Sequence, residues 1–126
     1  MYLISVYENG GFVEASLGGV VTPDEMKVFG MELQRHIEES GLERFNLLLD
    51  HAKSSYDETS FDELCGMKDK LYGCGAYQII DVVSSVEDKE RHTKARLQKV
   101  LEGFEDYVMD PSEAHFMPLA AIARAA

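Results

Sequence analysis

The sequence predicts a layered α/β domain whose mixed, mostly parallel sheet begins with a β-hairpin. Apolar residues alternate with the period of a strand in some segments and recur at helical spacing in others, so strands and helices follow one another. An Asn-Gly turn separates the first two strands, which favours an antiparallel start. The chain has 126 residues, 45% of them hydrophobic. That length is typical of one domain, so we expect a single domain over residues 1–126.

The opening hairpin is predicted from two short strands, over residues 2–7 and 12–17. Between them lies the segment 8–11, in which Asn9-Gly10 suits the positive φ angles of a tight hairpin turn. Gly18-Gly19 is expected either to end the second strand or to form a bulge in it.

A helix is predicted to start at Thr22, with Pro23 in its first position and Glu25 completing a capping box. Gly41 is a typical C-terminal stop. Between these signals, apolar residues recur at helical spacing and predict one buried stripe. The stripe consists of Met26, Phe29, Leu33 and Ile37.

The central part of the chain predicts a strand, a loop, a helix and a further strand. Residues 45–50 form a nearly continuous apolar run, typical of a central strand covered on both faces. Residues 51–59 are polar and are expected to form a loop. Ser60 and Glu63 form a second capping box, which predicts a helix to about residue 72. The apolar run over residues 76–83 predicts another strand.

A third helix is expected from Ser84 or Ser85 to about residue 102, followed by a short strand over 107–109. Asp110-Pro111-Ser112-Glu113 repeats the start signal of the first helix and predicts a final helix, which Pro118 would kink or delay. Its apolar side would consist of Phe116, Leu119 and Ile122.

Composition argues against several classes of function. The formal net charge is −11, from 23 acidic against 12 basic residues, so phosphate backbones and anionic lipids would be repelled. No apolar run approaches the roughly 18 residues of a membrane helix, and the first residues do not resemble a signal peptide. We therefore expect a cytoplasmic protein that neither binds nucleic acid nor inserts stably into a membrane.

The cysteines and histidines do not predict a metal or cofactor site. Cys65 and Cys74 are too few for a disulfide framework or a zinc site and are expected to be reduced thiols. The four histidines have no metal-ligand spacing. They are His36, His51, His92 and His115.

Three segments carry a resemblance to a known family. Residues 18–25 look like a strand followed by a Gly, a short loop and a capped first helix. Asn46 to Asp50 looks like a central strand ending in Asp, and residues 97–114 look like a closing helix-strand-helix unit. In this order and at this length, the chain resembles the STAS domain of anti-sigma factor antagonists and of the cytoplasmic tails of sulfate transporters. The CRAL-TRIO lipid-binding proteins are similar in topology.

The resemblance implies a phosphoacceptor in the loop or helix after the central strand. In antagonists a serine in an Asp-Ser-Ser-Gly pattern is phosphorylated there by a partner kinase. If Asp50 matches that Asp, His51 and Ala52 stand where the serines should be. If the loop is longer, Thr59 and Ser60 supply the hydroxyls at the helix start, where unpaired N–H groups and the helix dipole favour an anion. Thr59 and Ser60 are therefore candidate phosphoacceptors or anion ligands.

A candidate ligand or partner loop consists of Asp50, His51, Lys53 and Ser54, at the C-terminal end of the predicted central strand. Open α/β sheets bind ligands at that edge. One alternative is a hydrolase in which His51 acts as base, Asp50 orients it and Ser54 is the nucleophile, but the chain has no Gly-x-Ser-x-Gly elbow. A second alternative is a CRAL-TRIO-like domain that binds a small ligand at this edge, which needs no catalytic group.

Taken together, these features predict a non-enzymatic regulatory or protein-interaction module without a cofactor. Its partner would be another protein, and a homodimer is compatible with the fold. Because the chain is acidic, we expect salt-sensitive binding to a basic partner.

Overall fold

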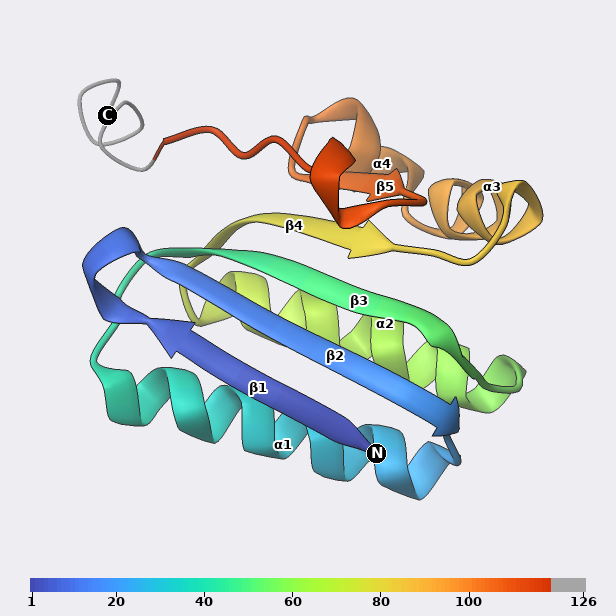
Figure 1. Cartoon of the computed structure of the whole chain (residues 1–126), viewed down its shortest axis with the longest axis horizontal. Coiled ribbons are helices and arrows are strands. Elements are labelled where there is room, and N and C mark those ends of the chain that lie inside the picture. The colour runs from blue at the N-terminus through green and yellow to red at the C-terminus, as the bar shows by residue number, and fades with distance from the viewer. Residues whose placement is uncertain (119–126) are drawn as a thin grey trace.

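The computed structural model describes residues 1–118 and confirms the predicted fold class. Five strands form one sheet in the order β1-β2-β3-β4-β5 (Figure 1). β1 pairs antiparallel with β2, and every later pair is parallel. The strands are β1 (Tyr2–Tyr7), β2 (Phe12–Val20), β3 (Phe45–Ser55), β4 (Ala76–Val82) and β5 (Glu105–Val108).

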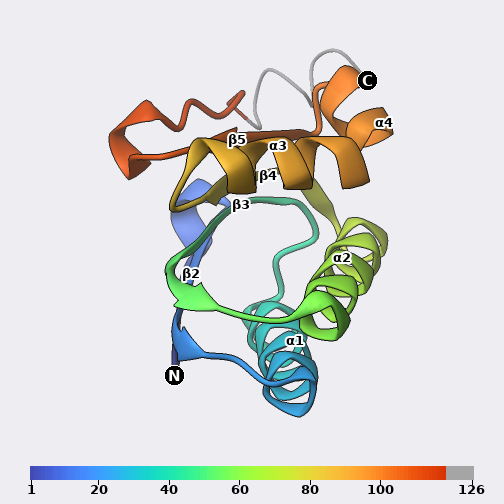
Figure 2. The ribbon, with the colours of Figure 1, turned by 90° about the vertical axis from the view of Figure 1, so that its right-hand side faces the viewer.

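Four α-helices connect the parallel strands, and α1 and α2 lie side by side on one face of the sheet (Figures 1 and 2). α3 lies beside β5 (Figure 2). The helices are α1 (Pro23–Ser40), α2 (Glu58–Gly73), α3 (Val86–Ala95) and α4 (Leu97–Leu101), with single 3₁₀ turns at Glu8–Gly10 and Pro111–Glu113.

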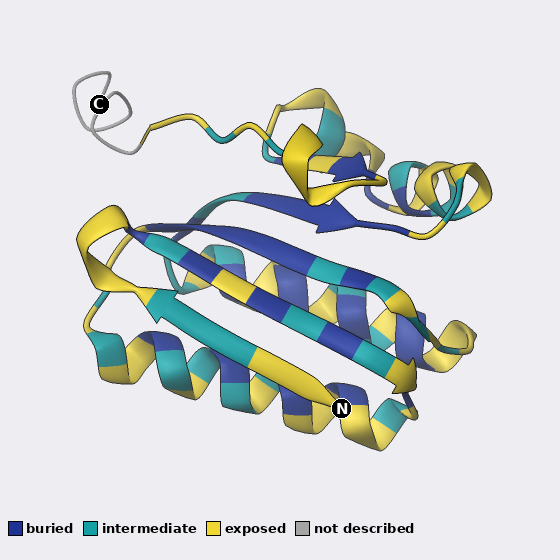
Figure 3. Cartoon of the chain, viewed as in Figure 1, coloured by how far each residue is buried: buried dark blue, intermediate teal, exposed yellow. Residues whose placement is uncertain are grey.

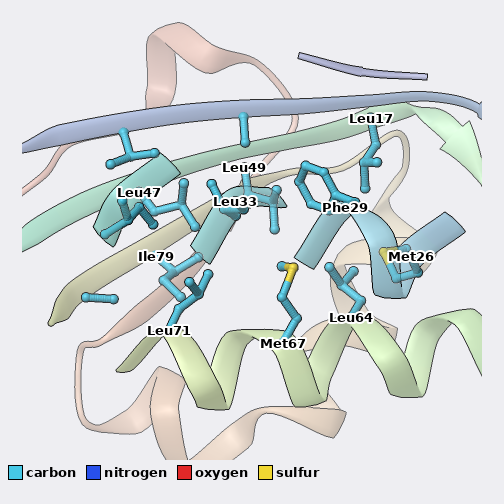
Figure 4. Close-up of a cluster of buried hydrophobic side chains, with 14 of the residues drawn as sticks. Leu17, Met26, Phe29, Leu33, Leu47, Leu49, Leu64, Met67, Leu71 and Ile79 are labelled. Atoms are coloured by element: carbon cyan, nitrogen blue, oxygen red, sulfur yellow. The ribbon is translucent and has the colours of Figure 1, made fainter. Parts of the chain in front are cut away.

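The main hydrophobic core fills the space between the sheet and the pair α1–α2 (Figure 4). Alternate residues of β2 and β3 face these helices because successive strand side chains point to opposite faces. From α1 come the four residues of the predicted stripe, all buried. From α2, Leu64, Met67 and Leu71 meet them.

The start and the end of α1 agree with the prediction. The Thr22 hydroxyl accepts a hydrogen bond from the Glu25 N–H (3.2 Å), and the Glu25 carboxylate lies 3.5 Å from the Thr22 N–H, so the capping box is present. Gly41 ends the helix in the left-handed conformation (φ 77°).

The predicted loop 51–59 is wrong, since β3 continues to Ser55. It pairs with Gly18, Gly19 and Val20, which also extends β2 past its predicted end at Leu17. The register shifts between Ser16 and Gly18, so β3 holds an extra residue opposite β2 there. Such a bulge lets a polar segment continue a ladder that begins as an apolar core strand.

The predicted start of α2 is also wrong, because Asp57 rather than Ser60 caps it. The Asp57 carboxylate accepts from the Ser60 N–H at 2.9 Å. Ser60 lies inside the first turn, fully buried, and its hydroxyl donates to the Val21 carbonyl at 3.0 Å. Aspartate and serine are equally good capping residues. The helix is capped by Asp57 because β3 ends just before it, at Ser55.

The last third of the chain departs most from the prediction. Ser85 caps α3, as predicted, but the helix breaks at Arg96 and resumes as α4. The last strand begins at Glu105 instead of 107. After Asp110 the chain makes one 3₁₀ turn, and residues 114–118 are not helical. Leu119 and Ile122, two of the three apolar positions of the predicted final helix, lie outside the described residues.

The segment after β5 covers part of the second face of the sheet. Ala114 and Phe116 pack on a small cluster formed by Leu48, Ile80, Val82 and Val108. The Asn46 side chain donates to the Met117 carbonyl (3.0 Å), and the Met117 N–H donates to Gln78 (2.7 Å). Two short hydrogen bonds therefore fix this segment to β3 and β4.

Gly75 between α2 and β4 is predicted to be intolerant of any side chain. Its φ is +113°, and a Cβ there would lie 1.9 Å from the Glu43 carbonyl oxygen. We expect Gly75→Ala to lower the free energy of unfolding by about 2 kcal/mol, measured by urea denaturation. Gly73→Ala, where a Cβ meets nothing within 4 Å, is the control; a similar loss in both variants would contradict the steric argument.

Within residues 1–118, none of the helices is both long enough and apolar enough to cross a membrane.

Candidate functional site

A buried polar network lies between the sheet and helices α2 and α3, at the end of the sheet where β3 and β4 finish. β4 is buried over most of its length (Figure 3). We call these eight side chains, which are linked by hydrogen bonds or ion pairs, the polar network. They are His51, Tyr56, Lys68, Asp81, His92, Arg96, Glu105 and Tyr107.

Lys68 of α2 is the centre of the polar network. Its side chain has no exposed area, and its ammonium lies 2.8 Å from an Asp81 carboxylate oxygen and 3.1 Å from one of Glu105. It also donates to the Tyr107 hydroxyl at 2.9 Å. All three donor positions of the ammonium are therefore used, which is the condition for a lysine to be buried while charged.

Arg96 balances the second carboxylate. Its guanidinium forms a forked pair with Glu105, with N···O distances of 2.7–3.2 Å, and also reaches the exposed Asp69 at 2.8 Å. Arg96 is also the residue at which α3 ends and α4 begins. Two buried cations thus face two buried carboxylates.

A hydrogen-bonded chain leads from Asp81 to α3. His51 Nε2 lies 2.7 Å from an Asp81 oxygen, and the Tyr56 hydroxyl lies 3.1 Å from His51 Nδ1 and 3.0 Å from His92 Nε2. Because the carboxylate accepts, His51 carries its proton on Nε2 and accepts on Nδ1 from Tyr56. Tyr56 in turn accepts from His92 Nε2–H, which leaves His92 Nδ1 as an unprotonated nitrogen.

His92 Nδ1 is the one buried side-chain nitrogen or oxygen without a hydrogen-bond partner within residues 1–118. Its ring packs against the rings of His51, Phe61 and Tyr107, with centroids 4.8–5.2 Å apart. A lone acceptor in an aromatic box favours the neutral imidazole. Burial lowers the pKa of His92 to about 3, and the positive charge of the nearby Lys68 acts in the same direction.

The two carboxylates are held in the charged form. Burial alone would raise the pKa of Asp81, but the Lys68 ammonium and the hydrogen bond from His51 outweigh it and hold the pKa well below its usual range. The pKa of Glu105 is lowered against burial by Lys68, Arg96 and Tyr107. Burial and the adjacent carboxylates raise the pKa of Tyr107, so its hydroxyl stays a donor.

The polar network includes side chains of types that bind metal ions in other proteins. Its carboxylates, however, are already used in internal hydrogen bonds and ion pairs. Ligand atoms of His51, Asp81 and His92 all lie within 4.8 Å of one another. However, Asp81 uses one oxygen for His51 and the other for Lys68. A divalent cation would have to displace both and would lie near a buried ammonium, so the arrangement fits a structural ion-pair network better than a metal centre.

The predicted loop Asp50, His51, Lys53 and Ser54 is divided by the sheet. His51 points toward the helices into the polar network, while Asp50 accepts from the Ala52 N–H at the bulge (3.1 Å). The Ser54 hydroxyl donates to the His51 carbonyl at 2.7 Å. The hydrolase triad is therefore contradicted, since Asp81 rather than Asp50 orients His51 and Ser54 does not reach its ring.

Asp50 and Lys53 line a hollow of about 420 Å³ beside the start of β1 and the middle of β2. Lys53 is exposed and Asp50 half-buried. Asp50 and Lys53 therefore lie together at this hollow, whereas His51 lies in the polar network.

Thr59 and Ser60 lie in the first turn of α2 but in different surroundings. Thr59 is exposed, whereas Ser60 is fully buried, with its hydroxyl bonded to the Val21 carbonyl. Of the acids around them, Glu58 pairs with Arg91 (2.8 Å) and Glu63 with Lys27 (3.6 Å). Only Thr59 presents its hydroxyl to solvent.

Most of the polar network was missed from the sequence. Lys68, Arg96 and Glu105 are ordinary residues of amphipathic helices and strand ends, and their burial has no sequence signal. Asp81 offered one, because an acid inside the apolar run 76–83 would be buried on both faces and would need a cation. That its partner would be a lysine on a helix could be known only from the fold.

Comparison with known proteins identifies the fold. The structure is similar to "Structure of the Anti-Sigma Factor Antagonist SpoIIAA in its Unphosphorylated Form", with a TM-score of 0.54 and 12% sequence identity over 99% of this chain and 97% of that one. No protein-family model matches the chain, and no curated protein matches it. The chain therefore has the STAS-like fold of this anti-sigma factor antagonist, in agreement with its element order.

Proposed function

We propose that the protein is a non-enzymatic regulatory module that binds another protein through its helical face. The supporting observation is the likeness of fold to an anti-sigma factor antagonist over nearly the whole chain. The polar network, which contains residue types common in catalytic sites, is largely buried, and apart from His92 Nδ1 its buried polar atoms are bonded to one another. Its role in this proposal is to fix the sheet, α2 and α3 relative to one another.

Thr59 is the phosphoacceptor in this proposal, and Ser60 its buried neighbour. The Thr59 hydroxyl is exposed in the first turn of α2, where free N–H groups and the helix dipole favour a phosphate. Because the partner is expected to be basic, a phosphate on Thr59 would add negative charge to the binding surface and strengthen the interaction. Ser60 would need the first turn to open before a kinase could reach it, because its hydroxyl is bonded to Val21.

The proposal is tested with tagged protein in extract of its native host. Wild type is expected to recover a specific protein at low salt and to lose it at about 0.5 M salt, since acidic surfaces bind through screened charges. Thr59→Glu should strengthen that recovery so that it persists to higher salt, while Thr93→Glu, on α3, should not. Failure to recover any specific protein at low salt would contradict the proposal. Intact mass and peptide mapping of the host protein would show whether Thr59 carries phosphate.

The second candidate function is small-ligand binding at the hollow beside Asp50 and Lys53. Its support is the juxtaposition of a lysine and an aspartate with the apolar side chains of Met1 and Leu3. Native mass spectrometry of the protein from its host would reveal a retained ligand, and Lys53→Met would release it if the ammonium holds an acidic group.

A further inference from the structure

The short segment after β5 lies on the second face of the sheet without joining it. We call residues 114–117 the strap; they follow the 3₁₀ turn Pro111–Glu113 and run back along the sheet (Figure 1). Within residues 1–118, the backbone of 115–118 makes two hydrogen bonds with the rest of the chain, both at Met117 and both to side chains, so no strand ladder holds it. The surface beneath the strap, which we call the seat, consists of Asn46, Leu48, Gln78, Ile80, Val82 and Val108.

Two amide side chains of the seat bind the backbone of the strap. Asn46 of β3 and Gln78 of β4 are direct neighbours in the parallel ladder. Asn46 Nδ2 donates to the Met117 carbonyl at 3.0 Å, and Gln78 Oε1 accepts from the Met117 N–H at 2.7 Å. Both backbone groups of one residue are thereby bonded, while its side chain is 47% exposed. The seat therefore recognises this position through its backbone.

The two amides are oriented by bonds that do not involve the strap. Asn46 Oδ1 accepts from the Gln78 backbone N–H (3.3 Å), and Gln78 Nε2 donates to the Gly103 carbonyl (3.1 Å). Asn46 is buried and interrupts the apolar run 45–49, and a buried amide is costly unless its hydrogen bonds are made. Because the seat is already arranged for a peptide backbone, a segment that binds there orders few additional side chains.

The seat also holds one aromatic side chain. Phe116 packs on the four aliphatic members of the seat, and its ring meets the ring of Phe12 edge-on, with centroids 5.7 Å apart. The strap contains no acidic residue, lysine or arginine. These contacts define the peptide that the seat fits, namely a non-helical, uncharged segment with an aromatic residue followed by a residue bound through its backbone.

We propose that the seat is a binding site for such a segment of a partner protein, and that the strap is an internal ligand that occupies the site in cis. The partner's aromatic side chain would replace Phe116, and the backbone of its next residue would lie between Asn46 and Gln78. Because the strap is tethered close to β5, its effective concentration is high and a partner must displace it. The site lies on the opposite face of the sheet from α1 and α2, so it is independent of the helical face.

Fluorescence anisotropy of a dye-labelled synthetic peptide with the sequence of residues 111–118 tests the proposal, with the full chain as receptor. Phe116→Ser removes the aromatic side chain of the strap and is expected to bind the peptide at least about tenfold more tightly than wild type does. Phe116→Leu keeps an apolar group on the seat and should lie between the two. A peptide with serine in place of its phenylalanine should not bind. Because no charge is involved, about 0.5 M salt should leave the binding unchanged.

The amides are tested in the Phe116→Ser background. Adding Gln78→Ala removes the acceptor that the Met117 N–H uses in the strap, and should weaken peptide binding about fivefold. Adding Gln98→Ala, at an exposed position on α4, is the matched control and should leave the affinity unchanged. Equal affinities in these two double variants would contradict recognition of the backbone by Gln78.

The proposal is overturned by equal binding to wild type and both Phe116 variants, by equal binding of the peptides with and without phenylalanine, or by no binding to Phe116→Ser at about 1 mM peptide. Circular dichroism shows that each variant is folded, and Phe116→Leu serves alone if the serine variant unfolds. A wild-type dimer that Phe116→Ser abolishes would show that the strap of a second copy fills the seat, which would also overturn the proposal of a separate partner.

Discussion

Replacing Lys68 by methionine is expected to lower the free energy of unfolding by about 3–5 kcal/mol at neutral pH. Methionine matches the length of the lysine stem but not its charge. The variant leaves Asp81 and Glu105 buried near each other without the ammonium that contacts both. Removing one partner of a buried ion pair costs far more than the pair contributes, because the remaining charge keeps its full desolvation penalty.

Urea denaturation followed by circular dichroism measures this loss. Lys70→Met, two residues along the same helix and exposed, should change the free energy by less than about 0.5 kcal/mol. Adding Asp81→Asn and Glu105→Gln to Lys68→Met should recover part of the loss, because the uncompensated charges are then gone. A loss below about 1 kcal/mol in the single variant would show that the carboxylates are protonated or hydrated in the folded chain.

The second large effect is acid destabilisation through His92. Its pKa is about 3 in the folded chain against 6.5 for an ordinary histidine. Between these values the unfolded chain binds one proton more, so stability rises with pH and falls as the pH drops below 6.5. From pH 7 to pH 4 this contribution amounts to about 3 kcal/mol.

Asp81 and Glu105 act in the same direction at lower pH. Their pKa values are lowered by folding, so the stability they contribute is present above the unfolded pKa of about 4 and is lost as the pH falls toward the folded values. The two contributions separate by pH, since only the histidine acts between pH 6.5 and 5.

His92→Phe tests the assignment, because a phenyl ring fills the aromatic box but takes up no proton. We expect the dependence of unfolding free energy on pH, measured by urea denaturation between pH 6 and 4.5, to become shallower by about 1 kcal/mol per pH unit. His115→Phe, at an exposed position in the segment after β5, should leave it unchanged. Equal pH dependence in wild type and His92→Phe would mean that another group takes up the proton.

Prediction from sequence succeeded where a signal is local. The capping box at Thr22, the stop at Gly41 and the apolar stripe of α1 depend on residues within a few positions of one another, and the structure reproduces them. Two of the errors concern residues whose partners are distant in the sequence. β3 extends past Asp50 because β2 is there to pair with it, and Arg96, which lies at the break between α3 and α4, pairs with Glu105.

The sequence by itself determined the layered α/β class, the opening hairpin and the order of strands and helices, because these follow from hydrophobic period and turn chemistry. Only the tertiary structure decided which polar residues are buried together. Asp81, Lys68 and Glu105 lie on three different elements, and the order of the sheet brings them to one point. A charged residue has the same local pattern whether it faces solvent or a counter-charge, so burial of charge is fixed by packing alone.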